Sequence, residues 1–290
     1  NNHFNRKDLK VVFRSYSIKM SGNTLKFDSL ADELAELVTK YVYSKKEILA
    51  GGEQKSYRNA IKYFGIKDPS TDGKFGELFL YALVESVLEC PMIAHKLRSL
   101  TNFSDQVKGG DVIFMGKYKF GDSKEIDACL IGESKIMQNF SDGVKDALES
   151  IDRFHSGPGS EVYTSTEYIV AREHLSDNAV EHSQAILSML NPTSEEFHKN
   201  TVIHPVFIMY NTPRIDTIEK KAINKSEAEE EITKYWNSRS DATLKLINDQ
   251  LDNFPNLQKV ILDFFLIPVN SVENFRNTLY YQLHGVPFKK

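Results

Sequence analysis

The chain has 290 residues, of which 41% are hydrophobic and 26% charged, and its formal net charge is −4. This composition is that of an ordinary globular protein with one large or two small domains. No apolar run reaches the ~20 residues of a spanning helix, so we expect no membrane segment. The acidic balance excludes an overall basic surface of the kind with which many proteins hold nucleic acid. A local patch of Lys108, Lys117, Lys119 and Lys124 can still contact a phosphate backbone.

The N-terminus and the cysteines indicate a cytoplasmic protein. Residues 1–7 lack the apolar core of a signal peptide. Cys90 and Cys129 are predicted at a helix end and inside a strand, and we expect buried thiols of a reducing compartment rather than a disulfide. The eight histidines show no metal-binding spacing with these cysteines, which argues against a zinc site.

Residues 1–72 are predicted to form a first unit, an N-terminal strand with a helical cap. Leucines recur at helical spacing after Asp28 or Ser29, either of which can cap a helix, and Gly51-Gly52 ends that helix. The elements expected here are a strand at 10–18, a helix at about 30–49 and a helix at about 54–64.

Residues 73–290 are predicted to form the second unit. Its first elements are a helix at 74–89, a strand at 92–99, a strand opening at Asp111, a strand ending at Lys135, a helix starting at Ser141 or Asp142 and running to 154, and a strand at 206–210. The last strand is expected to start after Pro205, because proline cannot donate a ladder hydrogen bond. This αβββαβ order predicts an α/β fold with a mixed central sheet.

The rest of the second unit adds helices and one strand. A polar, mostly helical stretch is expected up to about residue 190, and the charged run at 220–231 is expected to be a solvated helix face. The further elements expected are helices at about 226–236 and 242–251, a strand at 260–267 and a helix at 271–284.

Glu133 and Lys135 are an acid and a base two residues apart at the end of an apolar run. Alternate residues of a strand share a face, so both side chains should point into the same space. Ser134 should point to the other face and be structural. The dyad alone also fits an ordinary ion pair at a sheet edge.

The register of the hairpin decides whether Asp111 joins this dyad. Gly121-Asp122 is the turn signal between the two strands. If the loop runs from Gly121 to Ser123, two residues pair across the hairpin when their numbers sum to 244. Asp111 then faces Glu133 on the same side of the sheet. A two-residue loop shifts the pairing by one and turns Asp111 to the other face. Two carboxylates and an ammonium together can hold a divalent metal and a phosphate.

Glu77 is a third candidate carboxylate. It stands at the start of the helix predicted at 74–89 and shares a stripe with Leu80, Tyr81 and Val84. A carboxylate on an apolar stripe is costly to bury unless it is paired or bound to a metal. The alternative is that Glu77 only complements the helix dipole.

This pattern resembles a known family. Gly-Glu on a helix, Asp at a strand start and Glu-x-Lys at a strand end are similar to the PD-(D/E)xK nuclease superfamily, with Gly110 in place of the proline. From about Leu9 to Leu283 the chain looks like the HamA family, the nuclease subunits of the Hachiman anti-phage system. The segments that carry this likeness are 76–80, 110–114, 132–135, 204–208 and 264–269.

The resemblance implies a restriction-endonuclease-like core in 73–290 and a metal-dependent DNA endonuclease that acts in anti-phage defence with a superfamily 2 helicase subunit. It makes Asp111, Glu133 and Lys135 the catalytic residues, and Glu77, Asp111 and Glu133 the ligands of Mg²⁺ or Mn²⁺. An alternative stays open, in which the chain is an inactive nuclease-fold module that docks on or regulates a helicase.

Overall fold

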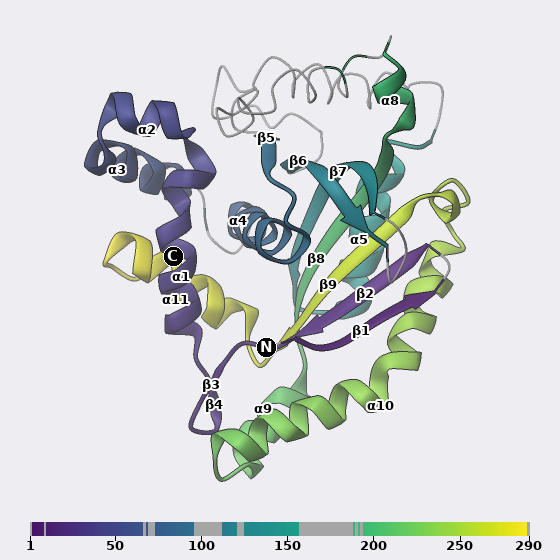
Figure 1. The fold of residues 1–290 in the computed structure, drawn as a ribbon. Helices are drawn as coiled ribbons and strands as arrows, with labels where there is room; N and C mark the ends of the chain where they lie inside the picture. The colour runs from purple at the N-terminus through teal and green to yellow at the C-terminus, as the bar shows by residue number, and fades with distance from the viewer. Residues whose placement is uncertain are drawn as a thin grey trace.

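The computed structural model describes residues 2–8, 10–65, 68, 73–95, 112–120, 125–156, 188, 191 and 194–288. Within them, helices surround one seven-stranded mixed sheet of order β1-β2-β9-β8-β7-β6-β5 (Figure 1). The strands are β1 (Asn2–Asp8), β2 (Val11–Tyr16), β3 (Met20–Ser21), β4 (Thr24–Leu25), β5 (Met92–His95), β6 (Val112–Lys119), β7 (Glu125–Met137), β8 (Thr201–Asn211) and β9 (Ile261–Val269). The helices are α1 (Phe27–Val42), α2 (Lys45–Gly51), α3 (Glu53–Phe64), α4 (Lys74–Leu83), α5 (Phe140–Asp152), α8 (Glu195–Lys199), α9 (Pro213–Lys221), α10 (Lys225–Leu251) and α11 (Val272–His284).

The sheet changes direction at β7. Strands β5, β6 and β7 form an antiparallel meander, whereas β7, β8, β9 and β2 run parallel to one another and β1 pairs antiparallel with β2. The order α4-β5-β6-β7-α5-β8 is the predicted αβββαβ order, and the predicted α/β class with a mixed sheet is confirmed. Because β2 lies in the same sheet as β9, the first residues help to build this sheet; the division at 72/73 stays a prediction.

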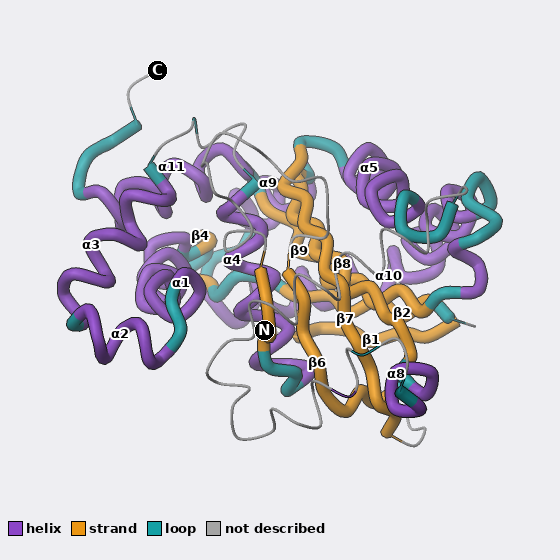
Figure 2. The backbone as a smooth tube through the Cα atoms, turned by 90° about the horizontal axis from the view of Figure 1, so that it is seen from above, coloured by secondary structure: helices purple, strands orange, loops and turns teal. Residues whose placement is uncertain are grey.

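Helices cover both faces of the sheet (Figure 2). Helices α1, α3 and α11 gather with α4 on one side, and α5 lies on the other. The contacts of single residues agree: a Cβ on Gly132 would lie 2.7 Å from Leu80 of α4, whereas a Cβ on Gly143 of α5 would lie 3.1 Å from Ile208 of β8. Ile208 pairs with Lys135, so even-numbered residues of β7 face α4 and odd-numbered ones face α5.

The predicted single helix at 30–49 was wrong, because the structure has α1 and α2 there. Ser44 and Glu47 form a capping box, in which the Ser44 hydroxyl accepts a hydrogen bond from the Glu47 N–H and the Glu47 carboxylate accepts one from the Ser44 N–H. This starts a new helix after the extended Tyr43. No side chain caps α1, which starts at Phe27, so neither predicted N-cap acts there.

Helix α5 is also capped differently from the prediction. The side chain of Asn139 accepts a hydrogen bond from the Ser141 N–H, and the helix begins at Phe140. Ser141 and Asp142, the predicted start of the helix, therefore lie inside its first turn. Asparagine at an N-cap satisfies an N–H that has no partner within the helix.

The two helices predicted at 226–236 and 242–251 are one helix, α10, of 27 residues. Its buried positions continue through the predicted gap, since Trp236, Ser240 and Thr243 are all buried and follow at spacings of four and three. A continuous buried face stabilises the helix despite the polar residues between. No helix or strand was predicted at the positions of β1, the β3–β4 hairpin or α9.

The strand predicted to begin after Pro205 also differs from the structure. Strand β8 runs from Thr201 to Asn211 with Pro205 in its interior, between β7 and β9. Proline is usually absent from central strands because it lacks a ladder donor. Here the side chain of His204 supplies the missing donor to β7. The polar stretch expected up to 190 lies almost entirely outside the described residues, and so do 96–99.

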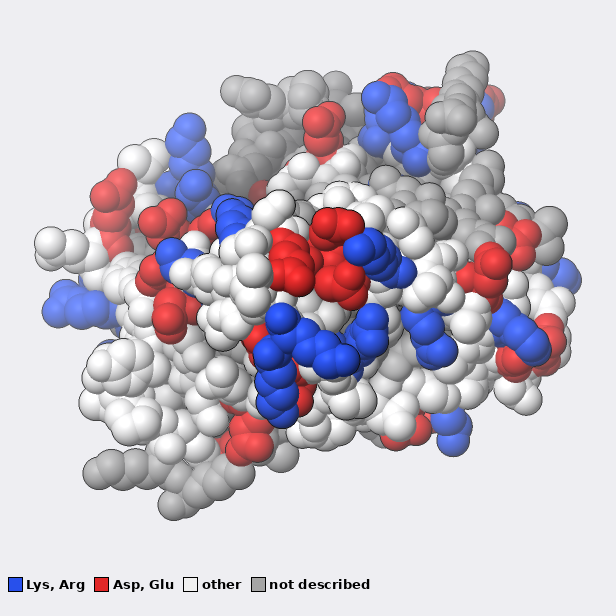
Figure 3. Space-filling view, turned by 90° about the horizontal axis from the view of Figure 1, so that it is seen from below, with Lys and Arg blue, Asp and Glu red and all other residues white. Residues whose placement is uncertain are grey.

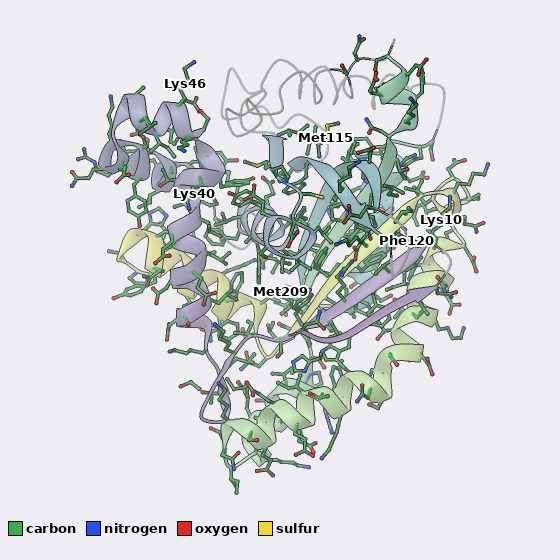
Figure 4. The ribbon with its side chains drawn as sticks, viewed as in Figure 1. Lys10, Lys40, Lys46, Met115, Phe120 and Met209 are labelled. Carbon is green, nitrogen blue, oxygen red and sulfur yellow. The ribbon has the colours of Figure 1, made fainter. Side chains whose placement is uncertain are left out.

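The surface carries mixed charges. Seen toward α9 and α10, lysines and arginines gather beside a group of acidic side chains (Figure 3). Ion pairs there join Lys220 to Asp216 at 2.6 Å and Lys234 to Glu230 at 2.7 Å, which agrees with a solvated helix face. Lys40 and Lys46 lie on the α1–α2 lobe (Figure 4).

Two members of the expected lysine patch form cross-strand ion pairs. Lys117 lies 2.5 Å from Asp127 and Lys119 lies 3.0 Å from Glu125, whereas Lys108 and Lys124 lie outside the described residues. Cys90 and Cys129 are buried free thiols, as predicted. Among the described helices, none combines the length and the apolar character that a membrane crossing requires.

We expect Gly132→Ala to destabilise the fold by about 1–3 kcal/mol, because the added methyl group overpacks against Leu80. Urea unfolding of the single and double variants measures this. In a Leu80→Ala background the same glycine substitution should cost much less, since the clashing atom is gone. Equal costs in both backgrounds would show that this contact does not limit the approach of α4.

Candidate active site on strand β7

Glu133 and Lys135 form an ion pair on the α5 side of β7. The Lys135 Nζ lies 2.7 Å from Glu133 Oε1, and only 6% of the Glu133 side chain and 23% of the Lys135 side chain are exposed. Lys135 Nζ also donates a 3.4 Å hydrogen bond to Ser150 Oγ of α5. Glu133 and Lys135 therefore share one face of β7, as predicted. Ser134 faces α4, where a Cβ on Gly76 would lie 2.9 Å from its Oγ.

The described pairing of β6 with β7 reaches the residue before this dyad. The described pairs run from Lys119↔Glu125 to Val112↔Gly132, so of the two registers considered they have the one in which paired numbers sum to 244. Asp111, the next residue, lies outside the described residues. Strand β7 continues its pairing with β8 as far as Met137↔Tyr210. From Glu133 to Met137, β8 is therefore the strand that pairs with β7 within the described chain.

A buried histidine supports β7 just before the dyad. Pro205 has no N–H to give to β7, and the Ile131 carbonyl accepts a 2.8 Å hydrogen bond from His204 Nδ1 instead. His204 is fully buried, and its Nε2 lies 2.8 Å from Nε2 of His155, which follows α5. Because Nδ1 of His204 donates to a carbonyl, its neutral ring accepts at Nε2, and His155 must be the donor in this pair.

Burial controls the charge of this histidine pair. Desolvation by burial, with His155 close by, lowers the pKa of His204 to about 3. Burial also lowers the pKa of His155, against the opposite influence of Asp152. Both rings are therefore neutral near pH 7, as their hydrogen bond requires. The pair connects the end of α5 to the strand that carries Glu133.

Glu77 lies in the first turn of α4 and is buried, with 8% of the residue exposed. Its Oε2 accepts a 3.0 Å hydrogen bond from the Tyr41 hydroxyl of α1. Since α4 packs on the Gly132 and Ser134 side of β7, Glu77 and Glu133 approach the strand from opposite faces. The residues that the structure describes contain no group of three His, Cys, Asp or Glu side chains placed to hold a metal ion. Asp111 is not one of these described residues.

Sequence reasoning missed Ser150, His155 and His204 as neighbours of the dyad. The signal for His204 is in the sequence: it precedes a proline inside an apolar run, where a neighbouring strand lacks a donor. Ser150 and His155 carry no comparable signal, because only the packing of α5 on β7 brings them to Lys135 and His204.

The sequence model of the HamA family matches residues 1–283, nearly the whole chain. The chain belongs to the HamA family. The likeness noted in its motifs is thus confirmed, and membership makes this chain a component of the Hachiman anti-phage defence system. No curated protein matches the chain. In this HamA family member, Glu133 and Lys135 lie where the described β6 ladder ends.

We expect the His204–His155 pair to make the fold sensitive to acid. The folded pKa of His204 is about 3, against 6.5 for a free imidazole, so the unfolded chain binds the extra proton first as the pH falls. Stability is therefore complete above about pH 6.5 and falls below it, by up to ~1.4 kcal/mol per pH unit for one histidine. Denaturant unfolding at several pH values measures this slope.

The variant His204→Asn should be less stable at pH 7 but should lose less stability between pH 6.5 and pH 4. His198→Asn, on the exposed side of α8, is the matched control and should leave the slope as in the wild type. A wild-type slope retained in His204→Asn would contradict the assignment.

Proposed function

We propose that this HamA family member is a metal-dependent DNA endonuclease that works with a superfamily 2 helicase subunit. The observation that carries the proposal is the Glu133–Lys135 pair, whose carboxylate is almost fully buried beside the end of the described β6 ladder. A buried ion pair rarely repays its desolvation through stability alone. Its position agrees with a site at which a strand edge, an acid and an ammonium meet a phosphodiester.

The proposed metal ligands are Glu133, Asp111 and Glu77, as the family resemblance implies. Carboxylate oxygens suit Mg²⁺ or Mn²⁺. Glu133 fits this role by its burial, and Asp111 fits by sequence, because it precedes Val112, the partner of Gly132. Glu77 fits less directly, since its carboxylate is bound by Tyr41 on the other side of β7. A bound divalent ion would supply a Lewis acid and lower the pKa of a water ligand.

Lys135 is proposed to act on the attacking water and on the phosphate. Glu133 and Ser150 hold its ammonium from two sides, so its Nζ position is restricted before substrate arrives. A fixed ammonium stabilises the negative charge that grows on the phosphoryl oxygens and orients the attacking water. Only the neutral amine form of Lys135 can accept a proton from that water. Glu133 forms an ion pair with Lys135 in the free protein and can exchange that contact for a metal ion.

Plasmid cleavage with Mg²⁺ or Mn²⁺, with and without the helicase subunit, tests the proposal. Lys135→Ala should reduce the rate by at least ~10²-fold, because both orientation of the water and charge stabilisation are lost. Lys145→Ala is the matched control, since Lys145 lies exposed on α5 beside Glu149 and should cut at the wild-type rate. Wild-type cleavage by Lys135→Ala would overturn the assignment, and no cleavage by the wild type under any condition would favour the docking module.

Metal binding can be measured without cleavage. In the wild type, Mn²⁺ at ~100 times its dissociation constant should stabilise the fold by about 2.7 kcal/mol, seen as a rise in melting temperature. Glu133→Gln should lose this rise, whereas Glu149→Gln on the exposed side of α5 should keep it. If Glu77→Gln keeps the full rise, Glu77 serves Tyr41 and is not a metal ligand.

A further inference from the structure

Arg276 of α11 reaches the same strand from the side of α4. Its Nη2 donates a 2.7 Å hydrogen bond to the carbonyl of Ile136, the residue that follows Lys135. The neighbouring Phe275 is fully buried, with its ring 6.0 Å from Phe79 and 6.3 Å from Phe27. Because Phe275 fixes this turn of α11 in the core, the guanidinium is held against β7 by the fold itself.

The hydrogen bond shows at which edge of β7 the guanidinium lies. Successive carbonyls of a strand point to opposite edges. The Ile131 carbonyl meets His204 of β8, so the carbonyls of Gly132, Ser134 and Ile136 point away from β8, toward the β6 side. Within the described residues the β6 ladder ends opposite Gly132. Arg276 therefore lies along the β6 side of β7, beyond the last described β6 pair and next to the Lys135 position.

At this edge of β7, only some of the hydrogen-bond donors of the Arg276 guanidinium have partners among the described residues. It has five N–H donors, and one of them meets the Ile136 carbonyl. Its Nε is buried and has no hydrogen-bond partner in the part of the chain that the structure describes. Burial lowers the pKa of Arg276, and the charges of Asp68 and Glu273 act against this effect. A half-buried cation with a buried N–H that lacks a partner is costly unless an anion completes its surroundings.

We propose that Arg276 is a phosphate-binding residue of the candidate active site, and that its remaining Nη donors contact the nucleic-acid backbone beside the scissile phosphate. The proposal rests on the proposed nuclease function. One Nη anchors the group on Ile136, and the planar fork leaves the other donors in a fixed arrangement that matches two phosphate oxygens. Lys135 and Arg276 then supply positive charge to the substrate from opposite faces of one strand.

Binding of a fluorescein-labelled DNA duplex in EDTA tests this without metal and without cleavage. Arg276→Gln keeps an amide donor for the Ile136 carbonyl but removes the charge. It should weaken binding about ten-fold and reduce the slope of log Kd against log salt by about one. Arg58→Gln is the matched control, because Arg58 is exposed on α3 and should bind as the wild type does.

Arg276→Lys separates charge from geometry. It should restore the salt slope but only part of the affinity, since an ammonium cannot bind two oxygens in one plane. Melting temperatures of all variants report any loss of the Ile136 contact. Wild-type affinity and salt slope in Arg276→Gln, with only a lower melting temperature, would overturn the inference and leave the nuclease proposal intact. A wild-type chain that neither binds nor cleaves DNA would overturn both.

Discussion

The close approach of α4 to β7 is the contact on which the candidate site depends. Two glycines allow it: Gly132 leaves room for Leu80, and Gly76 leaves room for Ser134. In each case the next residue is a glutamate, Glu77 on the helix and Glu133 on the strand. A side chain at either glycine would push the two elements apart, because the nearest atoms already lie within 3 Å of the added carbon. The packing that closes the core on this side therefore also places the two acids.

Strand β7 is held on its other face by α5. Ser150 contacts Lys135, and the His155–His204 pair fastens the end of α5 to the strand two residues before Glu133. In this pair His204 of β8 replaces the backbone donor that Pro205 cannot provide. A strand fixed from both faces restricts the rotamers of the side chains that it carries, and a site that must hold charges in place before its substrate arrives needs such support.

Periodicity was enough to predict the αβββαβ order and the shared face of Glu133 and Lys135, because each element follows from the pattern within one short segment. It left the hairpin register open between two loop lengths, and the described pairs have the register in which paired numbers sum to 244. It failed where local chemistry competes with periodicity, as at the Ser44 capping box that divides α1 from α2. It also failed where the partner is distant in sequence. His204 reaches Ile131 across 73 positions and Arg276 reaches Ile136 across 140. Local sequence can point to a donor such as His204, which precedes a proline, but it does not specify the distant carbonyl that the donor meets.

The charges described at the site balance one another. Two carboxylates, Glu77 and Glu133, stand beside two cations, Lys135 and Arg276, and the whole chain is acidic. A site of this kind does not attract a polyanion over long distances, because steering depends on excess charge of one sign. Under the proposed function, a divalent ion shifts the local balance by two charges, and a helicase partner can bring the DNA within contact distance. The net charge of −4 is therefore consistent with a nuclease whose capture of DNA is strengthened by its metal ion and its partner, while cleavage depends on the side chains of β7.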